Sequence, residues 1–144
     1  MTTIENLLKL HENREVWTSL KDQSVLQALT LMSEKNIGAI IVVDNNDVPI
    51  GIFSERDYAR KIILKGKSSK DTLLDEVMTK ELITVTKDYK IDLCMEIMIE
   101  KKIRHLPVLE DKKIVGIISI GDLLKIMIKE QKELIDHLQK FITS

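Results

Sequence analysis

The stretch that decides the fold is Gly51-Ile-Phe-Ser-Glu-Arg-Asp57 (GIFSERD), because it returns later in the chain as Gly116-Ile-Ile-Ser-Ile-Gly-Asp122 (GIISIGD). In both copies a short apolar run ends at a Ser, and an amphipathic segment follows. This order predicts a β-strand that leads directly into a capped helix. A motif that occurs twice also calls for a search for a longer internal repeat.

The repeat extends well beyond these seven residues. A shift of 66 residues aligns 16–43 with 82–109, and eight of the 28 aligned pairs are identical. After the turn at 45–47 the shift becomes 65, because the second copy is one residue shorter there. Turns tolerate such deletions better than helices or strands do. The chain is therefore predicted to contain two copies of one structural unit.

Hydrophobic spacing and turn residues predict the same order of elements in both copies. The predicted helices are 24–36, 54–66, 90–102 and one from Ser119, and the predicted strands are 16–18, 39–44, 48–53, 82–85, 105–110 and 113–118. This β-α-β-β-α order, present twice, gives a mixed α/β (α+β) fold. A unit of about 55 residues buries its sheet poorly alone, so we expect the two units to pack face to face.

The division of the chain follows from the repeat. The first repeat is placed at 13–67 and the second at 74–130, with a polar linker at about 67–73. An N-terminal helix is expected within 1–12, and a helical extension at 131–144. Both ends therefore lie outside the repeated unit.

The C-terminal extension carries a heptad pattern. Apolar side chains, with one polar break, recur at steps of four and three at Ile120, Leu124, Met127, Gln131, Leu134, Leu138 and Phe141. Two interpretations stay open for this helix. It either covers its own domain, against Ile4, Leu7 and Leu8, or forms a contact between two copies of the chain.

Composition narrows the classes of function. The 144 residues are 44% hydrophobic and 31% charged, which suits a packed core, and 22 basic residues balance 23 acidic ones. Near-zero net charge argues against direct nucleic-acid binding. One Cys and three scattered His give neither an intramolecular disulfide nor a metal-ligand cluster. Because we find no membrane-length apolar run and no leader pattern, we expect no membrane contact and a cytoplasmic setting.

The two Ser-x-x-Asp segments are the strongest candidates for ligand binding. Ser54 and Ser119 stand where a helix begins, and the free N–H groups there suit a phosphate or another polar ligand. Asp57 and Asp122, three residues later, would repel phosphate but can accept both hydroxyls of a ribose. The pair therefore favours a ribonucleotide. The alternative is that each segment is a capping box that only starts its helix.

The few arginines point the same way. Only four of the 22 basic residues are Arg, and Arg56, Arg60 and Arg104 lie in or near the repeated motifs. Arg is the better phosphate partner because its planar guanidinium donates several hydrogen bonds. We expect Arg104 and His105 to form the phosphate end of a cleft whose ribose end is Asp122. The alternative for Arg56 and Arg60 is a solvated helix face.

No arrangement of residues points to catalysis. The sequence contains no Walker loop, no G-x-G-x-x-G, no H-E-x-x-H and no plausible catalytic triad. Cys94 lies in the apolar pattern of the 90–102 helix and is predicted to be a core residue. We therefore expect a protein that is not an enzyme and has no catalytic cofactor.

In both repeats the order of motifs resembles a tandem pair of cystathionine-β-synthase (CBS) domains, also called a Bateman module. The resemblance covers residues 14–130 and is closest to stand-alone two-domain proteins, such as bacterial signal-transduction proteins and plant thioredoxin regulators. The matching segments are IGAIIVVD (37–44), GIFSERD (51–57), VMT (77–79), ITV (83–85), IRHLPV (103–108) and GIISIGD (116–122).

The resemblance implies a regulatory module that binds an adenosine-containing ligand in clefts between the repeats and signals to a separate partner protein. AMP is the first choice, with ATP, NAD or S-adenosylmethionine as alternatives, and homodimers are usual. The implied ligand-binding residues are Thr18, Ile37, Gly38, Ala39, Ser54, Asp57, Thr84, Ile103, Arg104, His105, Pro107, Ser119 and Asp122, with Arg56 added for its charge. The alternative function is a non-catalytic scaffold with vestigial clefts.

Two departures from the family pattern predict that the clefts differ. Where the second copy has VMT at 77–79, the first copy has His11-Glu12-Asn13 at the equivalent offset. Arg104 and His105 are matched in the first copy by the uncharged Gly38 and Ala39. Arg56 can compensate there, because Gly121 takes its place in the second copy.

Overall fold

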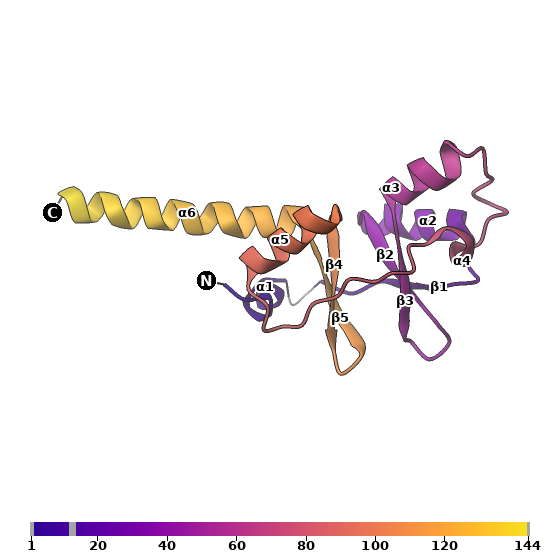
Figure 1. Cartoon of the computed structure of the whole chain (residues 1–144), viewed down its shortest axis with the longest axis horizontal. Helices are drawn as coiled ribbons and strands as arrows, with labels where there is room; N and C mark the ends of the chain where they lie inside the picture. The colour runs from indigo at the N-terminus through magenta and orange to yellow at the C-terminus, as the bar shows by residue number, and fades with distance from the viewer. Residues whose placement is uncertain (1, 12–13, 144) are drawn as a thin grey trace.

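The computed structural model describes residues 2–11 and 14–143, and it confirms the mixed α/β class (Figure 1). The first repeat forms β1 (Thr18–Leu20), α2 (Val25–Lys35), β2 (Ala39–Val43), β3 (Pro49–Ser54), α3 (Glu55–Asp57) and the π-helical continuation η1 (Tyr58–Ile63). The second repeat forms α5 (Ile91–Lys101), β4 (His105–Glu110), β5 (Lys113–Ser119) and α6 (Ile120–Thr143). Two short helices, α1 (Ile4–Leu10) and α4 (Leu74–Val77), precede the repeats.

The two sheets differ by one strand. In the first repeat β1 runs parallel to β2, and β2 pairs antiparallel with β3. In the second repeat β4 pairs with β5, but the predicted strand at 82–85 is wrong because only Val85 bridges to Val108. Pro107 stands where the first repeat has Ile41, and it has no backbone N–H to extend the ladder.

The central helices of the two repeats end in the same way. Asn36 after α2 and Lys102 after α5 both adopt the left-handed conformation, with φ of 54° and 55°. This conformation stops a helix and turns the chain toward the following strand. At the other end of α2, Ser24 and Gln27 form a reciprocal capping box. The repeat seen in the sequence is thus also a repeat of backbone geometry.

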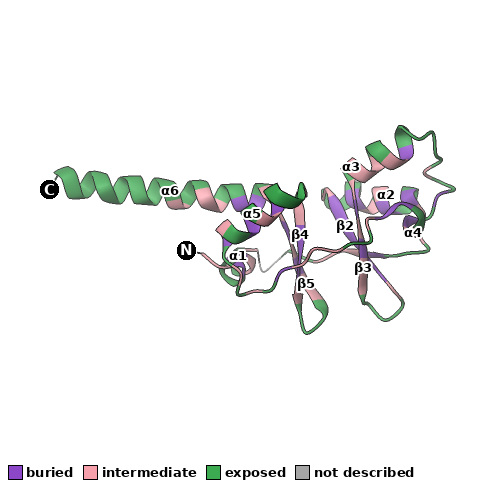
Figure 2. Cartoon of the chain, in the orientation of Figure 1, coloured by how far each residue is buried: buried purple, intermediate pink, exposed green. Residues whose placement is uncertain are grey.

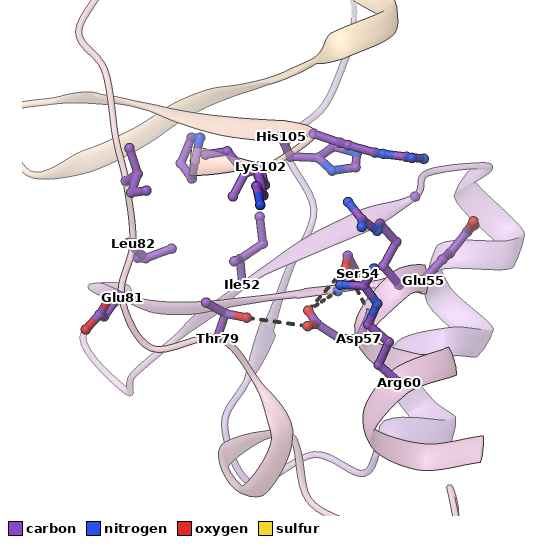
Figure 3. A pocket seen from close by; sticks show the side chains of 16 residues that line it. Ile52, Ser54, Glu55, Asp57, Arg60, Thr79, Glu81, Leu82, Lys102 and His105 are labelled. Atoms are coloured by element: carbon purple, nitrogen blue, oxygen red, sulfur yellow. Dashed lines mark hydrogen bonds between the residues drawn. The ribbon is translucent and has the colours of Figure 1, made fainter. Parts of the chain in front are cut away.

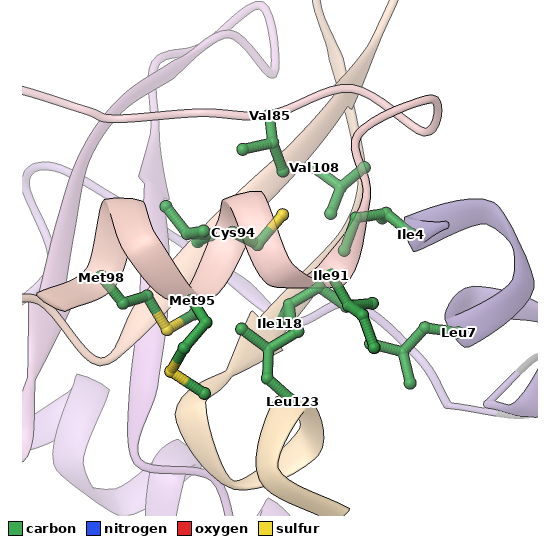
Figure 4. Close-up of a cluster of buried hydrophobic side chains, with 11 residues drawn as sticks. Ile4, Leu7, Val85, Ile91, Cys94, Met95, Met98, Val108, Ile118 and Leu123 are labelled. Atoms are coloured by element: carbon green, nitrogen blue, oxygen red, sulfur yellow. The ribbon is translucent and has the colours of Figure 1, made fainter. Parts of the chain in front are cut away.

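Each repeat has its own core, and a short helix from outside the repeat completes it (Figures 2 and 4). Leu74 and Val77 of α4 join the first core, around Phe53. Ile4 and Leu7 of α1 join the second core, which also contains Ile91, Cys94, Met98, Leu106, Ile118 and Leu123. A unit of this size gains stability mainly from such additional burial.

The positions of α1 and α4 correct one expectation. A Cβ on Gly51 would lie 2.6 Å from Met78 Sδ, and a Cβ on Gly116 would lie 2.6 Å from Leu8 Cδ2. Leu8 is therefore the counterpart of Met78, 70 residues earlier, and the first copy does have an equivalent of VMT in Leu7-Leu8-Lys9. The shift of 66 missed it because the segment that follows is four residues longer in the first copy.

The repeat boundaries 13–67 and 74–130 stay predictions. Residues 12 and 13 lie outside the described residues. They include one of these boundaries and part of the His11-Glu12-Asn13 segment.

The first half of α6 packs on the second repeat. Leu123 is fully buried, and Ile126 and Met127 lie against the same core as Ile4 and Leu7. Beyond Glu130, whose carboxylate accepts a hydrogen bond from the backbone N of Thr2, the helix projects away from the domain (Figure 1). The interpretation that α6 covers its own domain therefore holds only for its first half.

Candidate functional site

A cleft of about 310 Å³ lies between the two repeats (Figure 3), and we call it the Asp57 cleft. Its walls come from the β3–α3 junction, from the segment after α4, and from the start of β4. It is lined by Gly38, Ile52, Ser54, Glu55, Arg56, Asp57, Arg60, Thr79, Glu81, Leu82, Ile83, Lys102, Ile103, Arg104, His105 and Pro107. This volume is at the lower end of the range for small-molecule sites.

Asp57 uses its two carboxylate oxygens differently. Oδ2 accepts hydrogen bonds from the Ser54 backbone N at 2.9 Å and from the Ser54 hydroxyl at 3.1 Å, and Ser54 Oγ accepts from the Asp57 N at 3.2 Å. Ser54 and Asp57 therefore form a reciprocal capping box. It leaves Oδ1 with longer contacts, to Thr79 Oγ1 at 3.4 Å and Lys61 Nζ at 3.2 Å. Oδ1 is the oxygen available to accept a ligand hydroxyl.

Lys61 is fixed beside Asp57 by the π-helical turn. Its ammonium group donates to the Val77 carbonyl at 2.9 Å as well as contacting Asp57. Residues Tyr58–Ile63 form the π-helix that carries Lys61, and such segments are frequent at functional sites. The effect is a partly neutralised carboxylate, which lowers its repulsion of a nearby phosphate.

Basic residues from both repeats converge on the same cleft. Arg56 and Arg60 come from α3 and η1, while Lys102 and Arg104 come from the turn before β4. Four basic side chains thus face three acidic ones, Glu55, Asp57 and Glu81. The excess of positive charge suits an anionic ligand.

His105 lines the cleft at the start of β4, beside Gly38 of the first repeat. Its Nε2 would be 3.7 Å from a Cβ built on Gly38, an ordinary van der Waals distance, so the imidazole packs directly beside Gly38 of the other repeat. Burial lowers the pKa of His105 below 6.5, and Arg104 acts in the same direction, against the opposite effect of Asp122 and Glu55. At neutral pH this imidazole is therefore uncharged and can hydrogen-bond without adding positive charge.

Arg104 and His105 line the cleft with Asp57, whereas we expected them with Asp122. The backbone explains part of the expectation: the Ile120 N donates to the Arg104 carbonyl at 2.9 Å, so this residue does lie beside the start of α6. Both residues nevertheless line the wall of the Asp57 cleft. A sequence offset gives the position of a residue along the repeat but not which repeat its side chain faces.

Asp122 has a different partner. Its Oδ2 accepts from the Ser119 N at 3.0 Å and from Arg14 Nη1 at 3.1 Å, and His11 Nε2 lies 4.0 Å from Oδ1. Burial raises its pKa, but the hydrogen bonds from Ser119 and Arg14 outweigh burial, so the pKa lies below its ordinary value of 3.8. Arg14 thus lies beside the Asp122 carboxylate, where a second ligand would have to bind.

Eight of the predicted site residues line the Asp57 cleft, namely Gly38, Ser54, Arg56, Asp57, Ile103, Arg104, His105 and Pro107. The others lie elsewhere. Thr18 borders a hollow between the two hairpin turns, and Ile37 borders one beside α2. Ala39 is buried in β2 opposite Ser54. Thr84 precedes the Val85 bridge, and Ser119 and Asp122 lie at the start of α6.

Several cleft residues were not predicted from the sequence. Thr79 belongs to the VMT motif, so the motif was noticed but its hydroxyl was given no role. Lys102 reaches the cleft because it is the left-handed residue that ends α5, which its residue type does not indicate. Ile52, Glu81 and Leu82 have no distinguishing sequence signal.

Metal binding is not indicated by the residues that the structure describes. No group of three or more His, Cys, Asp or Glu side chains among residues 2–11 and 14–143 is placed to hold an ion. The described helices also include none with the length and apolar character needed to cross a membrane. Cys94 is buried, and burial raises the pKa of its thiol to about 11, so it is not an activated nucleophile.

A paired α/β module with a charged cleft between its halves, and with capped helices at the cleft wall, is the architecture that the comparisons with known proteins identify. The CBS domain matches residues 12–64 and 74–129, and the chain belongs to the CBS-domain family. CBS pairs of this kind are regulatory modules rather than catalytic domains.

Known proteins support this assignment. The mitochondrial CBS domain-containing protein CBSX3 of Arabidopsis thaliana is 38% identical over 98% of this chain and 72% of its own length. A solved signal-transduction protein with CBS domains from Burkholderia ambifaria MC40-6 is 45% identical, with a TM-score of 0.85 over 90% of this chain and 96% of that one. The CBS domain pair of protein MJ0100, 24% identical with a TM-score of 0.80 over 90% of this chain and 98% of that one, shares the fold.

Proposed function

We propose that the Asp57 cleft binds an adenosine-containing nucleotide and that its occupancy regulates a separate partner protein. One observation carries the proposal. Asp57, a carboxylate placed to accept ribose hydroxyls, lines the same cleft as basic side chains from both repeats. A ligand that contacts both repeats would change their relative placement, and this change can be read by a bound partner.

The cleft offers a surface for each part of a nucleotide. Ile52, Ile83 and Pro107 supply apolar contacts for a base. Asp57 Oδ1 supplies an acceptor for ribose hydroxyls, with Thr79 beside it. The basic groups supply donors for phosphate. The ribonucleotide class inferred from the repeated motif thus suits a single cleft.

Charge favours phosphorylated ligands over S-adenosylmethionine, which carries a sulfonium. AMP is our first choice, followed by ATP and NAD, because each brings negative charge to Arg56, Arg60 and Lys102. The MJ0100 pair was solved in complex with 5′-methylthioadenosine and S-adenosyl-L-methionine. That complex concerns MJ0100, and it supports the wider adenosine class for this fold.

The Asp57 cleft is proposed as the main site, in place of the Asp122 half. Arg14 already occupies the Asp122 carboxylate, and Gly121 stands where Arg56 lies in the first repeat. We therefore expect one nucleotide per chain. A homodimeric, cytoplasmic protein acting on an unidentified partner stays part of the proposal.

Isothermal titration calorimetry with AMP, ATP, NAD(H) and S-adenosylmethionine tests the proposal. We expect the wild type to bind at least one phosphorylated ligand, and Asp57→Asn to weaken it at least about tenfold, which is about 1.4 kcal/mol. Asp122→Asn is the matched control, because it changes the equivalent carboxylate outside this cleft. An amide retains an acceptor for the helix cap, so the substitution leaves α3 in place.

A scaffold with vestigial clefts is the second candidate, because the capping box explains Ser54 and Asp57 without any ligand. It predicts that Asp57→Asn alters only stability, by about 1 kcal/mol. If no adenine ligand binds the wild type more tightly than about 1 mM, nucleotide sensing is wrong and the scaffold explanation replaces it.

A further inference from the structure

A basic loop follows η1, at the end of the molecule opposite to the free end of α6 (Figure 1). Residues 58–70 contain five of the chain's 22 basic residues and no Asp or Glu, although acidic residues slightly outnumber basic ones in the whole chain. We call residues 63–70 the Lys65 loop. Every residue of this loop except Ser69 is exposed (Figure 2). The loop is therefore a local concentration of positive charge on the surface.

The lysines of the loop are not neutralised by the chain itself. Within residues 2–11 and 14–143, Lys65, Lys67 and Lys70 form no ion pair with an acidic side chain, whereas Lys61 just before them is paired with Asp57. Like charges that lie close together repel one another, so an acidic surface is the natural complement of this loop.

The backbone of the loop is held in a fixed shape at both ends. The Lys67 N donates to the carbonyl of Ile62, a buried residue of the first core, at 2.9 Å. Gly66 turns the chain there with a left-handed φ of 65°. At the other end, the Leu26 N of α2 donates to the Ser69 carbonyl at 2.9 Å. A preformed loop loses little conformational freedom on binding, which suits a partner of definite shape.

Exposed apolar side chains accompany the lysines. Ile63 and Leu64 directly precede Lys65, and they are 58% and 77% exposed. Leu26, whose backbone contacts Ser69, is 46% exposed at the other end of the loop. Burial of these side chains would add to the stabilisation gained from charge pairing. The complementary surface should therefore carry apolar groups as well as carboxylates.

We propose that the Lys65 loop is the docking surface for an acidic segment of another protein, in which Asp or Glu residues flank an apolar residue. A nucleic acid backbone offers anionic groups but no aliphatic side chain for Ile63 and Leu64. A membrane surface offers both, but it selects no particular loop shape, whereas this loop is anchored at both ends. The inference deepens the proposed function, and it rests on that function only in naming the docked protein as the regulated partner.

Lys61 connects this surface to the Asp57 cleft. It belongs to η1, which leads directly into the loop, and its ammonium group lies 3.2 Å from Asp57 Oδ1 and 2.9 Å from the Val77 carbonyl oxygen. A ligand hydroxyl at Oδ1 would compete with Lys61 for the same oxygen. Occupancy of the cleft can therefore alter η1 and the loop that continues from it.

Fluorescence anisotropy with a labelled peptide, measured without nucleotide, is the first test. The probe is the sequence Glu-Glu-Leu repeated four times. We expect the wild type to bind it with an affinity that falls as salt is added. Lys65→Glu with Lys67→Glu should weaken binding at least about tenfold, because it places like charges opposite each other. The matched control, Lys112→Glu with Lys113→Glu in the exposed β4–β5 turn, should change it by less than about twofold.

The second test separates the apolar contribution from the charges. Leu64→Ser should weaken binding of the Glu-Glu-Leu peptide about threefold and leave binding of an equally charged Glu-Glu-Ser peptide unchanged. Leu10→Ser, which changes an exposed leucine at the end of α1, should affect neither peptide. Circular dichroism checks that both variants are folded.

Three results would overturn the proposal. The first is a wild type that does not bind the Glu-Glu-Leu peptide more tightly than about 1 mM at low salt. The second is equal peptide binding by the wild type and the Lys65→Glu, Lys67→Glu variant, which would place the contact elsewhere. The third is a wild type that ignores the peptide but binds phosphatidylglycerol vesicles or a single-stranded oligonucleotide through these lysines, which would assign the loop to lipid or to nucleic acid.

Nucleotide calorimetry distinguishes failure of this inference from failure of the proposed function. The Lys65→Glu, Lys67→Glu variant should bind nucleotide within about twofold of the wild type, because neither lysine lines the Asp57 cleft. Nucleotide binding without peptide binding would refute the docking surface alone. Peptide binding without nucleotide binding would refute the nucleotide proposal alone.

Discussion

At the scale of single residues, two aspartates with the same backbone role differ in their neighbours. Asp57 and Asp122 both accept the backbone N–H of the Ser three residues earlier. Asp57 then contacts Thr79 and is paired with Lys61, four residues later, while Asp122 is paired with Arg14. The shared motif therefore produces two carboxylates that are each paired with a basic side chain, and only Asp57 lines the cleft between the repeats.

The Arg14 pair predicts a stability effect that depends on pH. The pKa of Asp122 is lowered in the folded state. The stability that its ionised carboxylate contributes is therefore present above pH 3.8 and is lost as the pH falls through the folded pKa. Arg14→Met should lower the free energy of unfolding by roughly 1 to 3 kcal/mol at pH 7.

Urea unfolding at pH 7 and at pH 3 measures this difference, which should shrink at the lower pH as Asp122 protonates. Arg60→Met, an exposed arginine at the Asp57 cleft, is the control and should stay within about 0.5 kcal/mol of wild type. An Arg14→Met variant as stable as the wild type at pH 7 would show that the ion pair contributes nothing.

His105 predicts a second dependence of stability on pH. Its direction is opposite to that of a histidine whose pKa is raised by an ion pair. Its pKa is lowered, chiefly by burial, so the folded protein binds fewer protons than the unfolded chain just below pH 6.5. Stability should therefore fall as the pH decreases from 6.5. His105→Gln should reduce this slope between pH 7 and pH 5, and the exposed His137→Gln should leave it unchanged. Thermal unfolding across this range measures both, and equal slopes in His105→Gln and wild type would contradict the assignment.

At the scale of elements, the short helices α1 and α4 act as equivalent covers for the two cores. Leu8, within α1, lies over Gly116, and Met78, the residue after α4, lies over Gly51. A Cβ on Gly51 would also lie 3.1 Å from the Thr79 carbonyl oxygen, so this glycine supports the cleft as well as the core.

A substitution at Gly116 tests the α1 contact. Gly116→Ala should lower the free energy of unfolding by about 1 kcal/mol, because the new methyl would displace Leu8 Cδ2, the end of a flexible side chain. Adding Leu8→Ala removes the overlap, so the double variant should lose less stability than the sum of the two single variants. Chemical denaturation measures all three. Strict additivity would mean that α1 does not pack on Gly116 in solution.

Elements with local signals were predictable from the sequence, and contacts between distant segments were not. The helices at 25–35 and 91–101 and the four hairpin strands follow from periodicity, capping and turn residues. The strand at 82–85 failed because Pro107, distant in sequence, removes the donor that its ladder needs. The role of α1 was missed because a longer connection changes the repeat offset from 66 to 70.

The candidate site shows the same limit. The Ser-x-x-Asp motifs and the arginines were found by residue type and spacing, and eight of the predicted residues line one cleft. Their grouping was not predictable, because Arg104 neighbours α6 through its backbone yet lines the cleft of the other repeat. Which repeat a side chain faces depends on tertiary packing rather than on local pattern.

At the scale of the whole molecule, the two repeats together create the charged Asp57 cleft. Neither repeat alone supplies both the carboxylate and the basic groups from the start of β4. A ligand in this cleft would contact both repeats, so its binding can change their relative placement.

Crystals of the wild type grown with ATP give the most direct test of the central claim, one nucleotide bound between the repeats at Asp57. We predict electron density for one nucleotide per chain, with its ribose hydroxyls at Asp57 Oδ1 and its phosphates among Arg56, Arg60, Lys102 and Arg104. Density at Asp122 with the Asp57 cleft empty, or no nucleotide density at saturating ATP, would contradict the account.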